Sequence, residues 1–315
     1  MILPVIARMM VQEHRFRPIT GRVLCLGPQL VALNKEEVDS LFARGRGTKA
    51  RTAEAARAAR GAHAPQVSDA YFFRKFKDVQ LDSLDVVPGF GGTIIHNLNE
   101  PIPDSLCDQF DFILDGGTFD HLMQLGTAFT NVIKMLKPGG RVLHFNAASG
   151  YIGATYVSFG PDLFYDYYVV NRFKDCRIHI LRGTGPGTHD PLDVFFVPDA
   201  RTKALNSVHH QMVACLAEKA DDSTWDAVPI EYTYRPPDLK ERFAEARARV
   251  LQSKRPMLTC DRPALPLLRE TFKKTRIEAA YAVERYHAGK FRWAKFQQHR
   301  RRNTAGTGYV YLGRL

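Results

Sequence analysis

The amino-acid sequence predicts an α/β protein with a mostly parallel sheet, helices on both sheet faces and a basic, mainly helical C-terminal extension. Residues 110–114 form an apolar block without helical periodicity, as expected of a strand buried on both faces. Between 119 and 136, apolar residues recur at steps of three and four, which is typical of an amphipathic helix. Pro138-Gly139-Gly140 ends this helix, and residues 141–145 predict a second strand. A strand, a helix and a parallel strand form a right-handed crossover unit.

Similar patterns continue on both sides of this unit and predict seven strands in total. The other five predicted strands cover residues 22–27, 79–85, 93–99, 176–181 and 211–217. An additional strand-like run covers 193–197. The strands at 110–114 and 141–145 then occupy the fourth and fifth places along the chain.

We expect three regions along the chain. They are an N-terminal segment over 1–20, the α/β domain over 21–235 and the C-terminal extension over 236–315. About fifty residues separate the first two strands, which is more than a single crossover needs. Residues 44–76 are therefore predicted to form a helical insertion or lid. The predicted helices of the whole connection cover 35–43, 50–60 and 69–76.

Small and polar residues follow the fourth and fifth strands. Asp115, Gly116 and Gly117 come directly after one, and Asn146 after the other. Ligands of such sheets bind beyond the carboxyl ends of the strands, where these residues are expected.

Three motifs in this part of the chain resemble the class I, Rossmann-like S-adenosylmethionine-dependent methyltransferases. They are Phe-Asp-Phe-Ile-Leu-Asp at 110–115, the pair Asp120-His121, and Leu-Lys-Pro-Gly-Gly at 136–140. The resemblance covers about residues 20 to 220 of the chain. It implies a seven-stranded Rossmann-like sheet and S-adenosyl-L-methionine as the cofactor.

The resemblance also implies where the cofactor binds. The first turn, with Gly27 and Gln29, would hold its methionine part, and Asp115, Gly116 and Gly117 would line the site. Asp85, which closes the second strand, would accept hydrogen bonds from the ribose hydroxyls, with Asp82 as the alternative. Asn97, after the third strand, would face the adenine.

The first turn departs from the family pattern. Cys25 stands where the family usually has an acid, and Gln29 and Val31 stand where it has further glycines. Glycines at such a turn allow close approach of the backbone to a ligand. Either the turn is altered or widened around a working site, or the cofactor site has decayed.

An aromatic, glycine-rich stretch follows the fifth strand, where the resemblance places the acceptor. Tyr151, Tyr156 and Phe159 are the predicted substrate-binding residues, because flat rings with polar tips suit a sugar or an aromatic ring. Phe164 and Tyr168 are spaced for packing into the core instead. The same stretch resembles methyltransferase-like proteins of bacterial surface-glycan gene neighbourhoods.

His121 and Asp120 are the predicted catalytic residues. An imidazole takes up a proton near neutral pH, so His121 suits the role of general base for a hydroxyl acceptor. The alternative is that His121 only shapes the pocket. His144 lies within a strand and is expected to be structural. No His or Cys pair has metal-ligand spacing, so no metal is expected.

Positive charge is concentrated near the C-terminal end. Residues 239–302 contain 18 Lys and Arg and 6 Asp and Glu, a net charge of 18 − 6 = +12, while the whole chain has +11. This segment could be a solvated helical appendage, or it could contact an anionic acceptor, an anionic membrane surface or, least in keeping with its motifs, nucleic acid.

The residue pattern favours a cytoplasmic enzyme. The apolar N-terminal residues are too few and too interrupted for a transmembrane segment, and the five cysteines are far apart and odd in number. Buried strand positions are expected for Cys25 and Cys215. The leading prediction is an O-methyltransferase for a sugar or another small hydroxyl acceptor. The alternative is a catalytically inactive methyltransferase-like binding or scaffolding protein whose basic C-terminal region engages an anionic partner.

Overall fold

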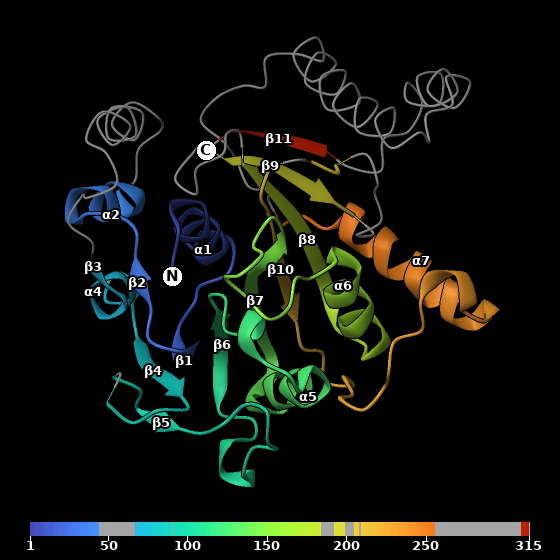
Figure 1. Cartoon of the computed structure of the whole chain (residues 1–315), viewed down its shortest axis with the longest axis horizontal. Helices are drawn as coiled ribbons and strands as arrows, with labels where there is room; N and C mark the ends of the chain where they lie inside the picture. The colour runs from blue at the N-terminus through green and yellow to red at the C-terminus, as the bar shows by residue number, and fades with distance from the viewer. Residues whose placement is uncertain are drawn as a thin grey trace.

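A computed structural model describes residues 1–43, 67–89, 91–183, 192–198, 205–207 and 209–255, and the backbone of 310–314. Nine strands of these residues form one sheet in the order β11-β9-β8-β10-β7-β6-β1-β4-β5 (Figure 1). Their bounds are β1 Gly21–Leu26, β4 Val79–Asp85, β5 Ile94–Ile95, β6 Phe110–Asp115, β7 Leu136–Ser149, β8 Lys174–Gly183, β9 Leu192–Val197, β10 Gln211–Glu218 and β11 Val310–Arg314. A separate two-stranded ribbon joins β2 (Leu30–Val31) and β3 (Val67–Ser68).

The strand order confirms the predicted Rossmann-like sheet. β5, β4, β1, β6 and β7 pair in parallel, in the doubly wound order 3-2-1-4-5 when counted along the chain. β10 lies antiparallel between β7 and β8, so β8 runs in the same direction as β7. These seven strands match the seven that the sequence predicts. β9 and β11 extend the sheet beyond β8 through two further antiparallel pairings.

Helices cover both faces of the sheet. α1 (Pro4–Phe16), α2 (Lys35–Phe42) and α4 (Asp69–Phe73) pack on one face, and α5 (Leu125–Met135), α6 (Pro161–Val170) and α7 (Pro237–Gln252) pack on the other (Figure 1). Strand periodicity explains the division, because successive side chains of a strand point to opposite faces. In β1, Val23 and Cys25 contribute to the core under α1, whereas Leu24 and Leu26 contribute to the core under α5.

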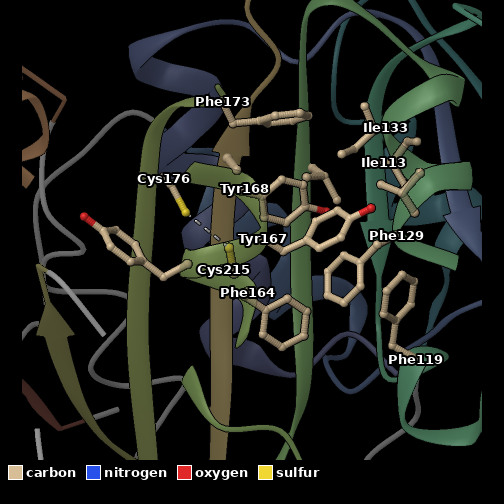
Figure 2. Packing of buried hydrophobic residues seen from close by; sticks show 14 of the residues in the cluster. Ile113, Phe119, Phe129, Ile133, Phe164, Tyr167, Tyr168, Phe173, Cys176 and Cys215 are labelled. Carbon is tan, nitrogen blue, oxygen red and sulfur yellow. Dashed lines mark hydrogen bonds between the residues drawn. The ribbon is translucent and has the colours of Figure 1, made fainter. Parts of the chain in front are cut away.

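The core under α5 and α6 is aromatic. Phe129 of α5 stacks on Tyr167 of α6, with ring centroids 4.4 Å apart (Figure 2). Phe164 and Tyr168, on the same helix, are fully buried, which confirms their predicted packing role. Cys215 and Cys25 are also fully buried in strands, as predicted.

The chain after β1 does not enter a helix directly. Leu30 and Val31 form the short strand β2, which pairs with β3, and Ile2 forms a bridge with Val31. α2 begins only after Asn34, whose side chain forms a capping box with Glu37. Val31 is buried in this ribbon. The turn is thus widened, which explains physically why residues other than glycine occupy positions 29 and 31.

Three predicted elements differ in extent. The helix predicted from residue 119 is interrupted: a 3-10 turn, η2 (Phe119–His121), precedes α5, and Met123 between them is exposed. The Asn99 side chain accepts hydrogen bonds from the backbone nitrogens of Met123 and Gln124, so it holds this break in place. The third strand shrinks to Ile94–Ile95, and the Pro-Gly-Gly element lies inside β7, where the register with β6 shifts.

The two ends of the chain also contribute to this core. α1, from the predicted N-terminal segment, buries seven residues against the sheet. α7, from the predicted C-terminal extension, buries Leu239, Phe243, Ala246 and Val250, and β11 pairs with β9. The short helix predicted at 69–76 is present as α4. The helix predicted at 50–60 and most of the basic segment after 255 lie outside the described residues.

Candidate functional site

The carboxyl ends of the parallel strands bring most of the predicted site residues together. Leu26 of β1 pairs with Leu84 on one side and with Asp115 on the other, and Asp115 in turn pairs with His144. The turns that follow β1, β4, β6 and β7 therefore lie side by side at one edge of the sheet. This edge is where ligands of doubly wound sheets bind.

Gly27 opens the first turn in a left-handed conformation, with φ of 75°. Such a φ favours glycine because it lacks a Cβ atom. The Gly27 nitrogen donates to the carbonyl of Leu84 at 2.7 Å. From the neighbouring turn, the Thr118 hydroxyl donates to the carbonyl of Leu26 at 2.5 Å. The end of β1 is thus fixed from both neighbouring strands.

Gln29 folds back into this turn. Its side-chain nitrogen donates to the carbonyls of Leu26 and Gly27, at 3.1 and 3.0 Å. Its side-chain oxygen is buried and has no hydrogen-bond partner among the described residues. A Cβ atom on Gly116 would lie 2.2 Å from that oxygen. Gly116 therefore has to be glycine while Gln29 adopts this position.

Asp85 lies at the end of β4, next to the first turn. One of its carboxylate oxygens accepts from the backbone nitrogen of Val87 at 3.1 Å, and the side chain is half-buried. Asp82, the alternative for the ribose, pairs with Arg22 at 2.7 Å and accepts from the Thr93 hydroxyl. Because Asp82 has these partners, the geometry favours Asp85 for the predicted role.

Asn97 holds a turn rather than presenting its amide to a ligand. Its nitrogen donates to the Glu100 side chain, and its oxygen accepts from the backbone and side chain of Asn99. Both the nitrogen and the oxygen of the Asn97 amide are therefore hydrogen-bonded within the loop that follows β5. The predicted contact between Asn97 and adenine would require them to rearrange.

Asp115 is fully buried and belongs to a hydrogen-bonded chain. One oxygen accepts from the backbone nitrogens of Gly117, Thr118 and Phe119, and the other contacts His144 Nδ1 at 2.8 Å. His144 Nε2 then lies 2.6 Å from the Tyr168 hydroxyl. Burial raises the pKa of Tyr168 well above its usual value. Asp115 thus shapes the turn after β6, and His144 has the structural role that its strand position predicts.

Asp120 is a second buried carboxyl group of the site. Both of its oxygens accept from the backbone nitrogen of Ala147, at 3.0 and 3.2 Å. Burial, followed by the charge of Asp115, raises the pKa of Asp120 to about 7. A carboxyl group with such a pKa can take up or release a proton near neutrality.

Two further side chains adjoin Asp120 and were not predicted in this role. The Asn146 amide lies close enough to favour the ionised form of Asp120, yet neither of its polar atoms has a hydrogen-bond partner among the described residues. Asn146 is only 1% exposed. The Tyr151 hydroxyl is also buried without such a partner, and burial, with the charge of Asp120, raises its pKa to about 12. A polar residue after the fifth strand was the available signal for Asn146.

The remaining predicted residues lie at the surface or in the core. His121 is exposed, and its ring lies 6.5 Å from that of Tyr156, which is itself exposed. Phe159 is buried and packs on Phe164 with ring centroids 5.1 Å apart. Phe159 therefore does not present a free face to a substrate, contrary to expectation. Its place after a glycine-rich loop suggested exposure, but its backbone is tied to Ala147 at the end of β7.

A small cavity lined by both apolar and charged side chains lies elsewhere, under the C-terminal half of α1. It is lined by Met9, Gln12, Glu13, Phe112, Leu143, Arg177, His179, Leu216 and Arg255. Burial, followed by the charge of Arg177, lowers the pKa of His179 to about 3, so this ring is neutral. Within the ranges that the structure describes, no three His, Cys, Asp or Glu side chains are arranged to hold a metal ion. None of the described helices is both long and apolar enough to cross a membrane.

Comparisons with known proteins give structural likenesses only. No protein-family model matches the sequence, and no curated protein matches it. A SAM-dependent methyltransferase from Archaeoglobus fulgidus is similar at 11% identity and a TM-score of 0.39, over 67% of this chain and 94% of that one. The Burkholderia thailandensis 1,6-didemethyltoxoflavin-N1-methyltransferase is similar at 18% identity and a TM-score of 0.34, over 68% and 79%.

The citrinin polyketide synthase CMeT domain is similar at 12% identity and a TM-score of 0.30, over 47% of this chain. The chain spans 35% of the length of that domain. Because all three TM-scores lie below 0.5, the fold is assigned from the strand order itself. Five parallel strands in the order 3-2-1-4-5, followed by a reversed strand between the fifth and sixth, form a doubly wound, Rossmann-like sheet.

Proposed function

We propose that the protein is an S-adenosylmethionine-dependent methyltransferase that acts on a small hydroxyl acceptor. The observation that carries this proposal is the position of Asp120. Its buried carboxyl group lies at the carboxyl edge of the sheet, beside the Asn146 amide that favours its ionised form, and its pKa is about 7. A proton acceptor placed beside buried polar groups suits a site that binds and activates an acceptor.

The residues of the first turn fit the cofactor. The buried, unpaired oxygen of Gln29 would accept a hydrogen bond from the ammonium group of the methionine part. A Cβ atom on Gly27 would come no closer than 3.6 Å to any neighbour, so the turn has room beside its backbone. The proposal therefore favours a working site with a widened turn over a decayed one.

Asp85 would hold the ribose hydroxyls. Beside it, Val86, Val87 and Ile95 are exposed apolar side chains at the ends of β4 and β5. Exposed apolar groups gathered at one edge suit a flat apolar partner, such as the adenine ring. Asn97 would turn toward that ring only by giving up its hydrogen bonds to Asn99 and Glu100.

When bound, the cofactor supplies a methyl group activated by its sulfonium. The protein then has to align the acceptor and accept its proton. Both His121 and Asp120 are placed next to the turn after β6. We assign the proton to Asp120, because His121 is exposed while Asp120 is buried beside Asn146 and Tyr151. His121 and Tyr156 would then lie at the entrance.

A non-catalytic alternative rests on Gln29. Its amide fills part of the first turn and occupies the position that a Cβ atom on Gly116 would need. If this amide excludes the methionine part, the protein would be a methyltransferase-like binding or scaffolding module. Its basic segment 239–302 would then engage an anionic partner, such as an anionic membrane surface or nucleic acid.

Calorimetric titration with S-adenosylhomocysteine separates the two functions. We expect binding by the unmodified protein, weakened by about 1–3 kcal/mol in Asp85→Ala because a charged acceptor of hydrogen bonds is lost. Asp82→Ala is the matched control and should leave the affinity within about twofold, as expected when no ligand contact is removed. Absence of binding by the unmodified protein would favour the non-catalytic alternative. Loss of binding in Asp82→Ala alone would place the ribose on the other acid.

A further inference from the structure

We infer, on the basis of the proposed function, that the methyl acceptor is a phenol with a second oxygen next to the methylated hydroxyl. In this arrangement the reacting hydroxyl lies at Asp120, the second oxygen lies at the Asn146 amide, and the aromatic ring lies on exposed apolar side chains of the neighbouring loops. Three observations support this class of acceptor over a sugar.

The first observation is the Asn146 amide. It is 1% exposed, and neither polar atom meets the geometry of a hydrogen bond among the described residues, although the amide favours the ionised form of Asp120 as a nearby donor would. Buried polar atoms are nearly always hydrogen-bonded, so the amide oxygen in particular requires an explanation. An amide donates from its nitrogen and accepts at its oxygen. A hydroxyl, which can both donate and accept, satisfies either end, and Asp120 beside the amide receives the neighbouring hydroxyl.

The second observation is a set of exposed apolar side chains on the two loops that meet at the Asp120 backbone, which we call the apolar rim: Met123, Ile152 and Tyr156. Their exposed fractions are 72%, 102% and 77%. The Tyr156 backbone nitrogen donates to the Asp120 backbone carbonyl at 2.9 Å, so the loop that carries Tyr156 is fixed beside the Asp120 backbone. Exposed apolar groups gathered at a candidate site mark an apolar ligand. The hydroxyl groups of a sugar would find few hydrogen-bond partners on these apolar side chains.

The third observation concerns proton transfer. Asp120, with a pKa of about 7, is a weak base. A phenol has a pKa of about 10, as in tyrosine, whereas an aliphatic hydroxyl is closer to the value of about 15.7 for water. Proton transfer to Asp120 is therefore far less unfavourable from a phenol than from an aliphatic hydroxyl. Burial, followed by the charge of Asp120, raises the pKa of the Tyr151 hydroxyl, which has no hydrogen-bond partner among the described residues.

The reaction balances without another reagent. The phenol oxygen forms a bond to the methyl carbon while the carbon–sulfur bond breaks, and the bonding pair of electrons stays on sulfur. The phenol proton passes to the Asp120 carboxylate and from there to solvent. The products are the methyl ether, S-adenosylhomocysteine and one proton.

A panel of three acceptors tests the inference with the full-length protein and S-adenosylmethionine. The probes are catechol, phenol and methyl glucoside, and the measurement is the rate of S-adenosylhomocysteine formation. We expect catechol to exceed phenol in kcat/KM by about tenfold, the effect of one hydrogen bond to a buried amide, and methyl glucoside to give no turnover. In Asn146→Leu, the ratio of kcat/KM for catechol to that for phenol should fall from about ten to about one, whatever the change in the rate with phenol itself.

Several results would overturn the inference. They are turnover of methyl glucoside at a rate equal to that of catechol, no turnover of either phenolic probe, or an equal loss for catechol and phenol in Asn146→Leu. Asn146→Ala, which adds no volume, replaces Asn146→Leu if the latter does not fold. S-adenosylhomocysteine binding distinguishes the two levels of failure: a protein that binds it but turns over only the sugar keeps the proposed function and loses this acceptor class.

Discussion

Asp120 and His121 are adjacent in sequence, but the fold gives them opposite environments. The 3-10 turn η2 directs Asp120 under the end of β7, where Ala147 donates to it, and leaves His121 exposed. A sequence motif identifies the pair but does not determine which member faces the interior. That choice depends on the break between η2 and α5, which the sequence pattern conceals because Met123 continues the apolar spacing of the helix.

The roles of these two residues can be separated by substitution. Asp120→Asn removes the proposed proton acceptor and should lower kcat by about 10²–10⁴-fold with little change in cofactor affinity. His121→Gln is the matched control and should stay within a few-fold of the unmodified protein. Because the base must be ionised, kcat should rise with pH up to about 7 and then level off. A pH-independent kcat, or a larger loss in His121→Gln, would assign the proton to the histidine.

Folding stability provides an independent measurement of the same carboxyl group. The pKa of Asp120 is raised in the folded protein, to about 7, so the folded state binds more protons than the unfolded state between about pH 4 and 7. The free energy of unfolding contributed by this group therefore falls as pH rises through that window. Asp120→Asn should remove this contribution, and urea denaturation at pH 5 and pH 8 would detect the change.

At the scale of elements, sequence periodicity predicts strands better than turns. The seven predicted strands all appear, and β4 has the predicted limits although only Ser83 and Leu84 are buried in it. The first turn was less predictable. Its shape depends on the pairing of β2 with β3, which lie more than thirty residues apart, and on Ile2 at the other end of the chain. The missing glycines signalled an altered turn but not its form.

The contact between Gln29 and Gly116 couples the turns after β1 and β6. Gly116→Ala would place a Cβ atom 2.2 Å from the Gln29 oxygen, so the amide must move. We expect Gly116→Ala to lower the free energy of unfolding by about 1–3 kcal/mol, the usual cost of overpacking. The double variant Gly116→Ala with Gln29→Ala should recover part of this loss because the clash is removed. Additive losses in a double-mutant cycle would contradict the coupling.

At the scale of the whole molecule, the chain ends are part of the structure that supports the site. The sequence suggested a terminal segment and a separate basic extension, because charge and composition change there. Composition does not reveal that α1 and α7 bury apolar faces on opposite sides of one sheet. The described part of the basic segment ends at Arg255, which is buried and pairs with three acids, Glu13 of α1, Asp175 of β8 and Glu218 of β10.

The last prediction concerns Glu13, which connects α1 to β7 and to the segment after α7. Its carboxylate accepts from Arg141 of β7 and, at 2.6 Å, from Arg255. All three side chains are buried. Breaking a buried ion pair by removing one partner leaves charge uncompensated and typically costs about 3–5 kcal/mol.

Glu13→Gln should therefore lower the free energy of unfolding by about 3–5 kcal/mol in urea denaturation. Glu36→Gln, at an exposed position on α2, is the matched control and should change the free energy of unfolding by less than about 0.5 kcal/mol.

If α1, the sheet and the segment after α7 form one cooperative unit, circular dichroism and tryptophan fluorescence should report the same midpoint in Glu13→Gln. Trp225 lies in the connection between β10 and α7, and its backbone carbonyl accepts a hydrogen bond from the Tyr167 hydroxyl of α6. Separate midpoints would mean that the C-terminal helix detaches while the remaining sheet stays folded.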